Sequence, residues 1–250
     1  MPSLNKNTVA VLLFWFVIVG YAQQKLSHNN NVWWHYLGKN NLNEKLSITL
    51  ETTMRYTDGV NQKQQYFVRP SVDYAFTKAF QASVGFTHYN TYVYGNPALN
   101  KVNSPENHVW IQGVYKHKIN AAKFTHRLRD ENRFVGIATL NSDANYEISH
   151  YEYRNRMRYM ILCSYPLYKT KNDQMFFLLA GDEVFLNIGS NAGKTLLNQN
   201  RMIGGVGFVF NKNHQIQLSY IHQNIWNFPN TILENNPTVR LTYITEFDFY

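Results

Sequence analysis

Charged residues, mostly arginine, recur at alternate positions within two stretches of the chain, residues 123–134 and 151–161. The charged residues of the two stretches are, in order, Arg127, Arg129, Glu131 and Arg133, then Glu152, Arg154, Arg156 and Arg158. Successive side chains of a β-strand point to opposite faces, so this spacing places every one of these charges on one face. Guanidinium groups bind carboxylates and phosphates through paired hydrogen bonds. This face therefore favours contact with anionic solutes or with internal Glu residues.

Charged residues of neighbouring expected strands fall on the same face. The candidate lumen-lining and anion-binding residues are Arg69, Arg127, Arg129, Glu131, Arg133, Glu152, Arg154, Arg156, Arg158, Glu183, Arg201 and Arg240. Glu51, Arg55, His108 and Gln112 share this face as further polar positions. Two interpretations stay open. The residues either line a narrow path that favours small anionic solutes, or form an Arg–Glu ladder that fills the interior.

The rest of the chain predicts the strands that would position these charges. Apolar and polar residues alternate over ten long stretches between residues 45 and 250. Short connections, such as residues 119–122, alternate with longer polar ones, such as residues 95–105 and 136–149. Tight turns on one rim and long loops on the other are typical of outer-membrane barrels. We therefore expect an all-β fold, an antiparallel transmembrane β-barrel of the outer-membrane type with about 10–12 strands.

The aromatic run at residues 32–37 does not fit an even number of strands. It predicts a partial strand, a plug-like segment at the periplasmic mouth, or one of two further strands in a twelve-stranded barrel. These three alternatives stay open at the level of sequence.

The first 22 residues predict a secretory signal peptide. Lys6 precedes an apolar run at residues 9–19, and the small residues Gly20 and Ala22 lead to cleavage after Ala22. Residues 23–250 then form one barrel domain with a net charge of 23 − 16 = +7. Cys163 is the only cysteine, so an internal disulfide cannot form. An exported protein rarely meets nucleic acid, so we do not expect a nucleic-acid partner despite the basic net charge.

Aromatic residues towards the strand ends favour a membrane barrel over a soluble sandwich or lipocalin-like barrel. They are Tyr56, Tyr74, Tyr92, Tyr115, Tyr151, Tyr168, Trp226 and Tyr243. Such residues form girdles at membrane interfaces. The chain also ends in a strand with Phe247 and Phe249 on one parity, similar to the signal that the barrel-assembly machinery reads, although Tyr250 has the opposite parity. We expect a cell outer-membrane location, with outer-membrane lipid and this machinery as partners.

Several motifs, taken in order, resemble a family of small outer-membrane barrels known only as domain of unknown function 2490. The motifs are Trp34, Glu106-x-His108-x-Trp110-x-Gln112, Arg127-x-Arg129-x-Glu131-x-Arg133-Phe134, Arg154-x-Arg156, Asp182-Glu183-x-Phe185 and Asn200-Arg201. The resemblance spans nearly the whole chain after residue 22. It implies a barrel in a Gram-negative outer membrane and implies no activity.

Catalytic and cofactor sites are weakly indicated. His126 and Asp130 share the outer parity of one strand, but the sequence places no Ser beside them, and such a triad is recognised by geometry. His214 and His222 are too far apart along one strand to bind a metal together. Gly204, Gly205 and Gly207 lie in a strand and predict room for a bulky neighbour.

We therefore expect a non-enzymatic barrel without a cofactor or metal, either a porin-like channel or a binder for small anionic solutes. The alternatives are a structural barrel that acts through its loops and a lipid acyl hydrolase or transferase.

Overall fold

The computed structural model describes residues 24–96, 98–170 and 174–250, and the expected signal peptide at residues 1–22 lies outside this part. The described residues form twelve β-strands. Their bounds are β1 Lys25–His28, β2 Asn31–Asn41, β3 Leu46–Thr57, β4 Gln62–Ala75, β5 Phe80–Thr91, β6 Ser104–Ile119, β7 Ala122–Leu140, β8 Tyr146–Lys169, β9 Met175–Ile188, β10 Leu197–Asn211, β11 His214–Trp226 and β12 Ile232–Asp248. These ranges contain no helix of the length and apolarity that a membrane crossing requires.

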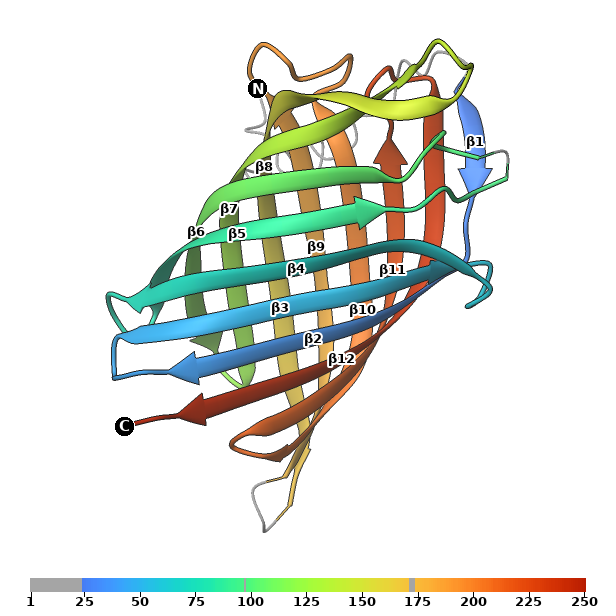
Figure 1. Cartoon of the computed structure of the whole chain (residues 1–250). Helices are drawn as coiled ribbons and strands as arrows, with labels where there is room; N and C mark the ends of the chain where they lie inside the picture. Colours follow the sequence, from blue (N-terminus) through green and yellow to red (C-terminus); the bar gives the residue numbers. More distant parts are fainter. Residues whose placement is uncertain (1–23, 97, 171–173) are drawn as a thin grey trace, which may run out of the picture.

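Strands β2 to β12 form a closed barrel in which each strand pairs with the next one along the chain (Figure 1). These consecutive pairs are antiparallel, from β2 with β3 to β11 with β12. The barrel closes between β12 and β2, and this last pair is parallel, with Val239 opposite Val32. The prediction of an all-β barrel of the outer-membrane type with about 10–12 strands is confirmed, at eleven strands.

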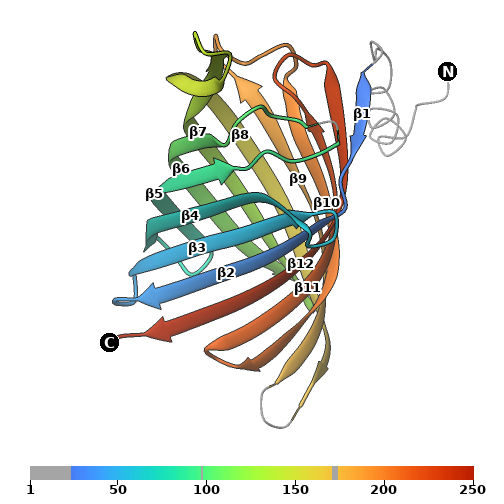
Figure 2. The ribbon, with the colours of Figure 1, turned by 45° about the vertical axis from the view of Figure 1, so that its right-hand side comes forward.

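The aromatic run at residues 32–37 belongs to a complete wall strand, β2. With an odd number of consecutively antiparallel strands, the first and last strands run in the same direction, so they can pair only in parallel. Strand β1 extends this seam beyond β2, because it also pairs in parallel with β12, with Leu26 opposite Leu233 (Figure 2). The run is therefore none of the three expected alternatives, because it forms a full eleventh wall strand that closes the barrel through a parallel seam.

One expected loop is mostly strand. Residues 136–149 predict a long connection, but β7 continues to Leu140 and β8 begins at Tyr146, leaving only residues 141–145 between them. The added residues pair with each other up to Leu140 opposite Tyr146. This pairing satisfies backbone groups that a loop would have to hydrogen-bond elsewhere.

The two faces of the wall differ in polarity as the alternation predicts. Outward residues are apolar and exposed, for example Ile111 at 60% and Leu218 at 50%, whereas Trp110 and Ser219, one position away on the inner face, are each 1% exposed. Expected girdle residues such as Tyr74, Tyr115 and Tyr243 are exposed on the outer face. Trp226 is an exception, because it is buried.

Buried apolar side chains form one cluster inside the barrel. The buried cluster consists of Trp33, Phe177, Leu179, Ile203 and Ile221, with Leu162, Met175 and Val209 packed against it. Gly207 makes this packing possible, because a Cβ atom at that position would overlap the ring of Phe177. The prediction that this glycine-rich segment leaves room for a bulky neighbour is confirmed at Gly207.

Candidate functional site

The predicted charged residues lie on the inner face of the barrel, most of them around cavities in the lumen and two of them near one rim. Those that line cavities in the lumen are Arg69, Arg127, Arg129, Arg133, Arg156, Arg158, Glu183, Arg201 and Arg240. Glu131 is fully buried among them. Glu152 and Arg154 form their own ion pair at 2.8 Å, near the loop rim and outside the cavities described below. The structure thus brings ten of the twelve candidates together.

The lumen contains three cavities in series. The loop-side cavity, at the rim with the longer connections such as the one that contains Tyr94, measures about 270 Å³. The central cavity measures about 90 Å³, and the turn-side cavity, at the opposite rim, about 300 Å³. The two outer cavities share no lining residue. The central one shares Arg158 and Arg201 with the loop-side cavity, and Arg69 and Arg127 with the turn-side cavity. The interior is therefore neither open throughout nor completely filled.

Two buried carboxylates organise the arginines of β7, β8 and β10. Glu131 Oε2 accepts hydrogen bonds from Arg156 Nε at 2.9 Å and Nη2 at 2.6 Å, and its Oε1 accepts one from Arg158 at 2.6 Å. Glu183 accepts from Arg158 at 2.7 Å and from Arg127 at 2.6 Å. Arg201 lies 3.6 Å from the same carboxylate. Forked guanidinium contacts of this kind hold side chains in fixed orientations.

A second network lies on the opposite wall, on β2 to β5. Arg69 donates to Glu51 at 2.8 Å, to the Thr87 hydroxyl at 2.9 Å and to the Tyr89 hydroxyl at 2.5 Å. The His35 ring lies 3.2 Å from the other oxygen of Glu51. Arg69 is 3% exposed, and its five N–H groups make it suited to join three strands at once.

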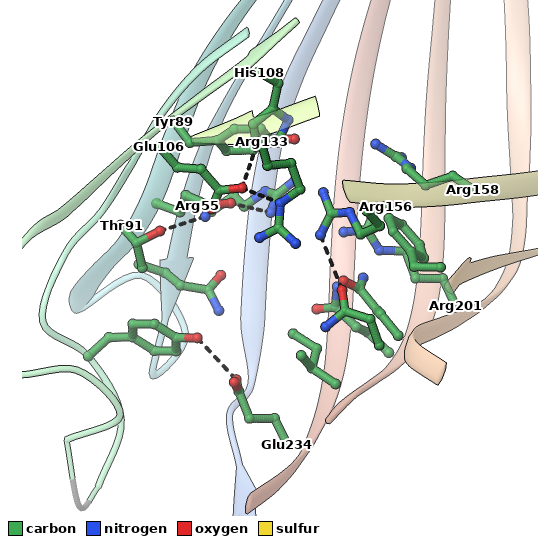
Figure 3. A pocket seen from close by; sticks show the side chains of 18 residues that line it. Arg55, Tyr89, Thr91, Glu106, His108, Arg133, Arg156, Arg158, Arg201 and Glu234 are labelled. Atoms are coloured by element: carbon green, nitrogen blue, oxygen red, sulfur yellow. Dashed lines mark hydrogen bonds and ion pairs between the residues drawn. The ribbon is translucent and has the colours of Figure 1, made fainter. Parts of the chain in front are cut away.

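The loop-side cavity has a carboxylate of its own. Glu106 accepts a hydrogen bond from Arg133 at 2.5 Å and also contacts the buried His108 ring. Figure 3 shows Arg133, Glu106 and Tyr89 on one side of this cavity, with Arg156, Arg158 and Arg201 on the facing side. The centre of the cavity is therefore approached by guanidinium groups from two walls.

Aromatic rings on the inner face support several of the guanidinium groups. The Arg55 guanidinium lies 4.1 Å from the Trp33 ring centre, and the Arg129 guanidinium lies 4.2 Å from the Trp110 ring centre. Phe185 lies beside three arginines, the nearest being Arg158 at 4.4 Å. Cation–π contacts stabilise a charge without neutralising it. The candidate set omitted these rings, although their shared parity with the charges was a usable signal.

The loop between β5 and β6 reaches across the loop-side mouth. Tyr94 is buried, and its hydroxyl donates a hydrogen bond to Glu234 of β12 at 3.0 Å. Burial, together with the nearby Glu234 carboxylate, raises the pKa of Tyr94 well above its usual range, which keeps the hydroxyl protonated as the donor. Neither residue was among the candidates, because a contact between residues 140 positions apart leaves no local pattern.

Positive charge exceeds negative charge in every cavity. The loop-side cavity is lined by five Arg and two Glu, 5 − 2 = +3. The central cavity is lined by six Arg and two Glu, 6 − 2 = +4. The turn-side cavity is lined by five Lys or Arg and three Asp or Glu, 5 − 3 = +2. Shared residues are counted in each cavity, and His is taken as neutral. The lumen can therefore attract anions along its length.

The residues considered for catalysis stay apart. His126 Nδ1 lies 2.8 Å from the Tyr159 hydroxyl, whereas Asp130 accepts a hydrogen bond from Asn155 at 2.8 Å. Across the described ranges, no hydrogen bond joins His126 to Asp130, and no group of three His, Cys, Asp or Glu is arranged to hold a metal ion. Within the described residues, His126 and Asp130 are therefore not joined as a catalytic pair would require.

Comparisons with known proteins bear on the family and the fold. The family model described as "Protein of unknown function (DUF2490)" matches residues 30–234, which confirms the resemblance expected from the motifs. A search of curated proteins finds no match. Among solved structures, the β domain of the Bordetella autotransporter BrkA is similar, with 10% sequence identity and a TM-score of 0.45. The similarity covers 72% of this chain and 78% of that chain.

Proposed function

The chain belongs to the DUF2490 family, and we propose that it is a non-enzymatic barrel of a Gram-negative outer membrane that takes small anionic solutes into its lumen. The observation that carries this proposal is the excess of guanidinium groups around three cavities in series. Charged groups that line a narrow lumen set the sign of the ions that enter it.

The outer face supports the membrane location. A water-soluble barrel would have to expose a continuous apolar wall, which includes Val84, Ile111 and Leu218, to solvent. Lipid is the solvent in which such a wall is stable. An assembly machinery inserts barrels into the outer membrane. We therefore propose this machinery and outer-membrane lipid as partners.

Some polar residues of the outer face pair with one another. Asn155 donates to Asp130 at 2.8 Å, and Asn200 donates to Asp182 at 2.9 Å. Internal pairing lowers the cost of placing such groups near lipid. Such pairing allows a polar side chain within an apolar outer face, as at Asp130, which lies opposite Ile111.

The loop-side cavity fits the first contact with a solute. Arg133, Arg156 and Arg201 present guanidinium groups, while Gln64, Gln199 and other amides supply neutral hydrogen-bonding groups. Its volume of about 270 Å³ lies just below the range of about 300–1,000 Å³ that is typical of drug-sized ligands. The proposed solutes are therefore small, and a carboxylate or phosphate group is their recognised part.

A second candidate function, a structural barrel that acts through its loops, is favoured by the small central cavity of about 90 Å³. Glu131 and Glu183 hold the arginines of that region in a hydrogen-bonded network. If the network never opens, solutes enter only the loop-side cavity and do not cross.

Planar-bilayer recordings test the proposal. The purified barrel should give a small conductance, and its reversal potential in a KCl gradient should show preference for chloride. Arg201→Gln removes a charge that lines both the loop-side and the central cavity, so it should reduce the anion preference. Lys45→Gln is the matched control, because it removes the same charge from an exposed turn.

A cation-selective conductance would contradict the proposal. A silent membrane together with no binding of small anions by the purified barrel would favour the structural alternative. The proposed absence of enzymatic activity has its own test, because deletion of the gene should leave lipid A and phospholipid mass spectra unchanged.

A further inference from the structure

The central cavity contains more positive charge than its surroundings neutralise. Its lining includes Arg55, Arg69, Arg127, Arg158, Arg201 and Arg240, but only two carboxylates, Glu51 and Glu183. Including Glu131, which binds Arg158 from outside the lining, still leaves 6 − 3 = +3. The excess therefore remains when this further carboxylate is counted.

The excess is concentrated on two arginines. Arg240 makes no hydrogen bond or ion pair with a side chain among the described residues, and the hydrogen-bond partner of Arg55 is the neutral amide of Gln65, at 2.5 Å. In addition, the buried Nε atoms of Arg55, Arg127 and Arg240 find no acceptor within the described part of the protein. Buried donors without acceptors destabilise a fold, by about 1–3 kcal/mol each and more when charged.

Arginine cannot relieve this situation by losing its proton. A buried lysine can become neutral, but the guanidinium group stays charged in proteins. The faces of Trp33 and Phe67 lie near Arg55, at 4.1 Å and 5.3 Å, yet a ring carries no net charge. Water can supply acceptors but cannot balance charge. The remaining way to neutralise the cluster is an anion.

The size of the central cavity limits what that anion can be. A volume of about 90 Å³ is about three times the share of one water molecule in the liquid. It is well below the volume that an organic ligand of ordinary size requires. A halide or a single tetrahedral oxyanion fits, with few waters beside it.

We infer that the central cavity holds one small inorganic anion, of the size of chloride or phosphate, as a resident counter-ion between Arg55, Arg127 and Arg240. This site adjoins the loop-side cavity, which Arg55 also lines, but it does not depend on uptake of a solute. The anion neutralises the unpaired guanidinium groups of Arg55 and Arg240.

The first test measures thermal unfolding of the purified barrel in detergent, at constant ionic strength. Sodium gluconate, whose anion is too large for the cavity, is compared with sodium chloride, sodium bromide and sodium phosphate. An anion present at about 100 times its dissociation constant should raise the unfolding midpoint by about 5–10 °C relative to gluconate. The ranking of chloride and phosphate identifies which of the two the site prefers. Equal midpoints in all four salts would overturn the inference.

Two variants separate the central site from general salt effects. Arg240→Gln removes an unpaired guanidinium without breaking a bond to Glu51 or Glu183, so the midpoint shift should fall by at least about half. Arg154→Gln removes a lumen arginine that lines none of the three cavities and should leave the shift unchanged.

A crystal grown in bromide provides a test that needs no variant. Anomalous density is expected between Arg55, Arg127 and Arg240. Bromide in the loop-side cavity alone would refute the inference while it supports the proposed function. Bromide in the centre without any effect on the unfolding midpoint would mean an adventitious ion and would also overturn it.

Discussion

The inner wall formed by β7 and β8 differs from the turn-side inner wall of β9 to β11. On β7 and β8, inward positions carry arginines around the fully buried Glu131. On β9 to β11, inward positions carry Phe177, Leu179, Ile203 and Ile221, which pack with one another. Both walls fill space, but the charged wall can exchange its hydrogen bonds with water or an anion, whereas the apolar wall cannot. A solute that enters the lumen as proposed would therefore follow the charged wall.

The energetics of the two walls differ as well. Apolar packing is stabilised by contact area and tolerates no added volume. The net contribution of a buried ion network to the free energy of folding is close to zero, because desolvation offsets the attraction between the charges. Removing one partner, however, strongly destabilises the fold. Substitutions on each wall should therefore act through different mechanisms, and the following predictions order them by expected effect.

Glu131→Gln should have the largest effect, because it removes the carboxylate charge that Arg156 and Arg158 share. Loss of one partner of a buried ion network costs about 3–5 kcal/mol in the free energy of unfolding. Urea unfolding in detergent measures this loss. Glu152→Gln is the control, since the Glu152 side chain is 40% exposed and its ion pair is worth at most about 1 kcal/mol. Equal effects of the two substitutions would show that the charged wall is not organised by Glu131.

Gly207→Ala should have the next largest effect, because its Cβ atom overlaps the ring of Phe177 on the apolar wall. Overpacking of this kind costs about 1–3 kcal/mol. Gly204→Ala is the matched control, because no atom lies within 4 Å of its added Cβ. The double variant Gly207→Ala/Phe177→Leu should recover part of the lost stability. If the double variant recovers no stability, the apolar wall rearranges around the added Cβ atom more easily than the packing of the cluster implies.

Tyr94→Phe should have the smallest effect, about 0.5–1.5 kcal/mol, since it removes one hydrogen bond to Glu234 at the mouth. The raised pKa of Tyr94 adds a pH dependence. Its contribution is fully present below the unfolded pKa of about 10 and is lost as the pH rises through the higher folded value. Limited proteolysis of the loop between β5 and β6, from pH 7 upwards, should show this opening in the wild type. In Tyr94→Phe the cleavage rate should not show this rise with pH.

Most of the charged wall could be predicted from the sequence, because a strand period of two is a local property. Arg127, Arg129, Arg156 and Arg158 face inwards as their spacing predicts. The apolar wall has the same parity, since Phe177 and Leu179 lie an even number of residues from Glu183. Its role as a packed cluster could not be predicted, because both parities are apolar along residues 175–179 and these side chains meet Ile203 and Ile221 only in the closed barrel.

The sequence by itself determined the strands, the face to which each Arg and Glu points and the approximate strand number, since all three follow from short-range alternation and turn signals. Tertiary structure alone decided the parallel seam between β2 and β12, which Glu neutralises which Arg, and the division of the lumen into three cavities. These features depend on closure and register, which set the neighbours of each inward side chain across the barrel. No local pattern encodes that relation, because the partners lie on strands that meet only when the barrel closes.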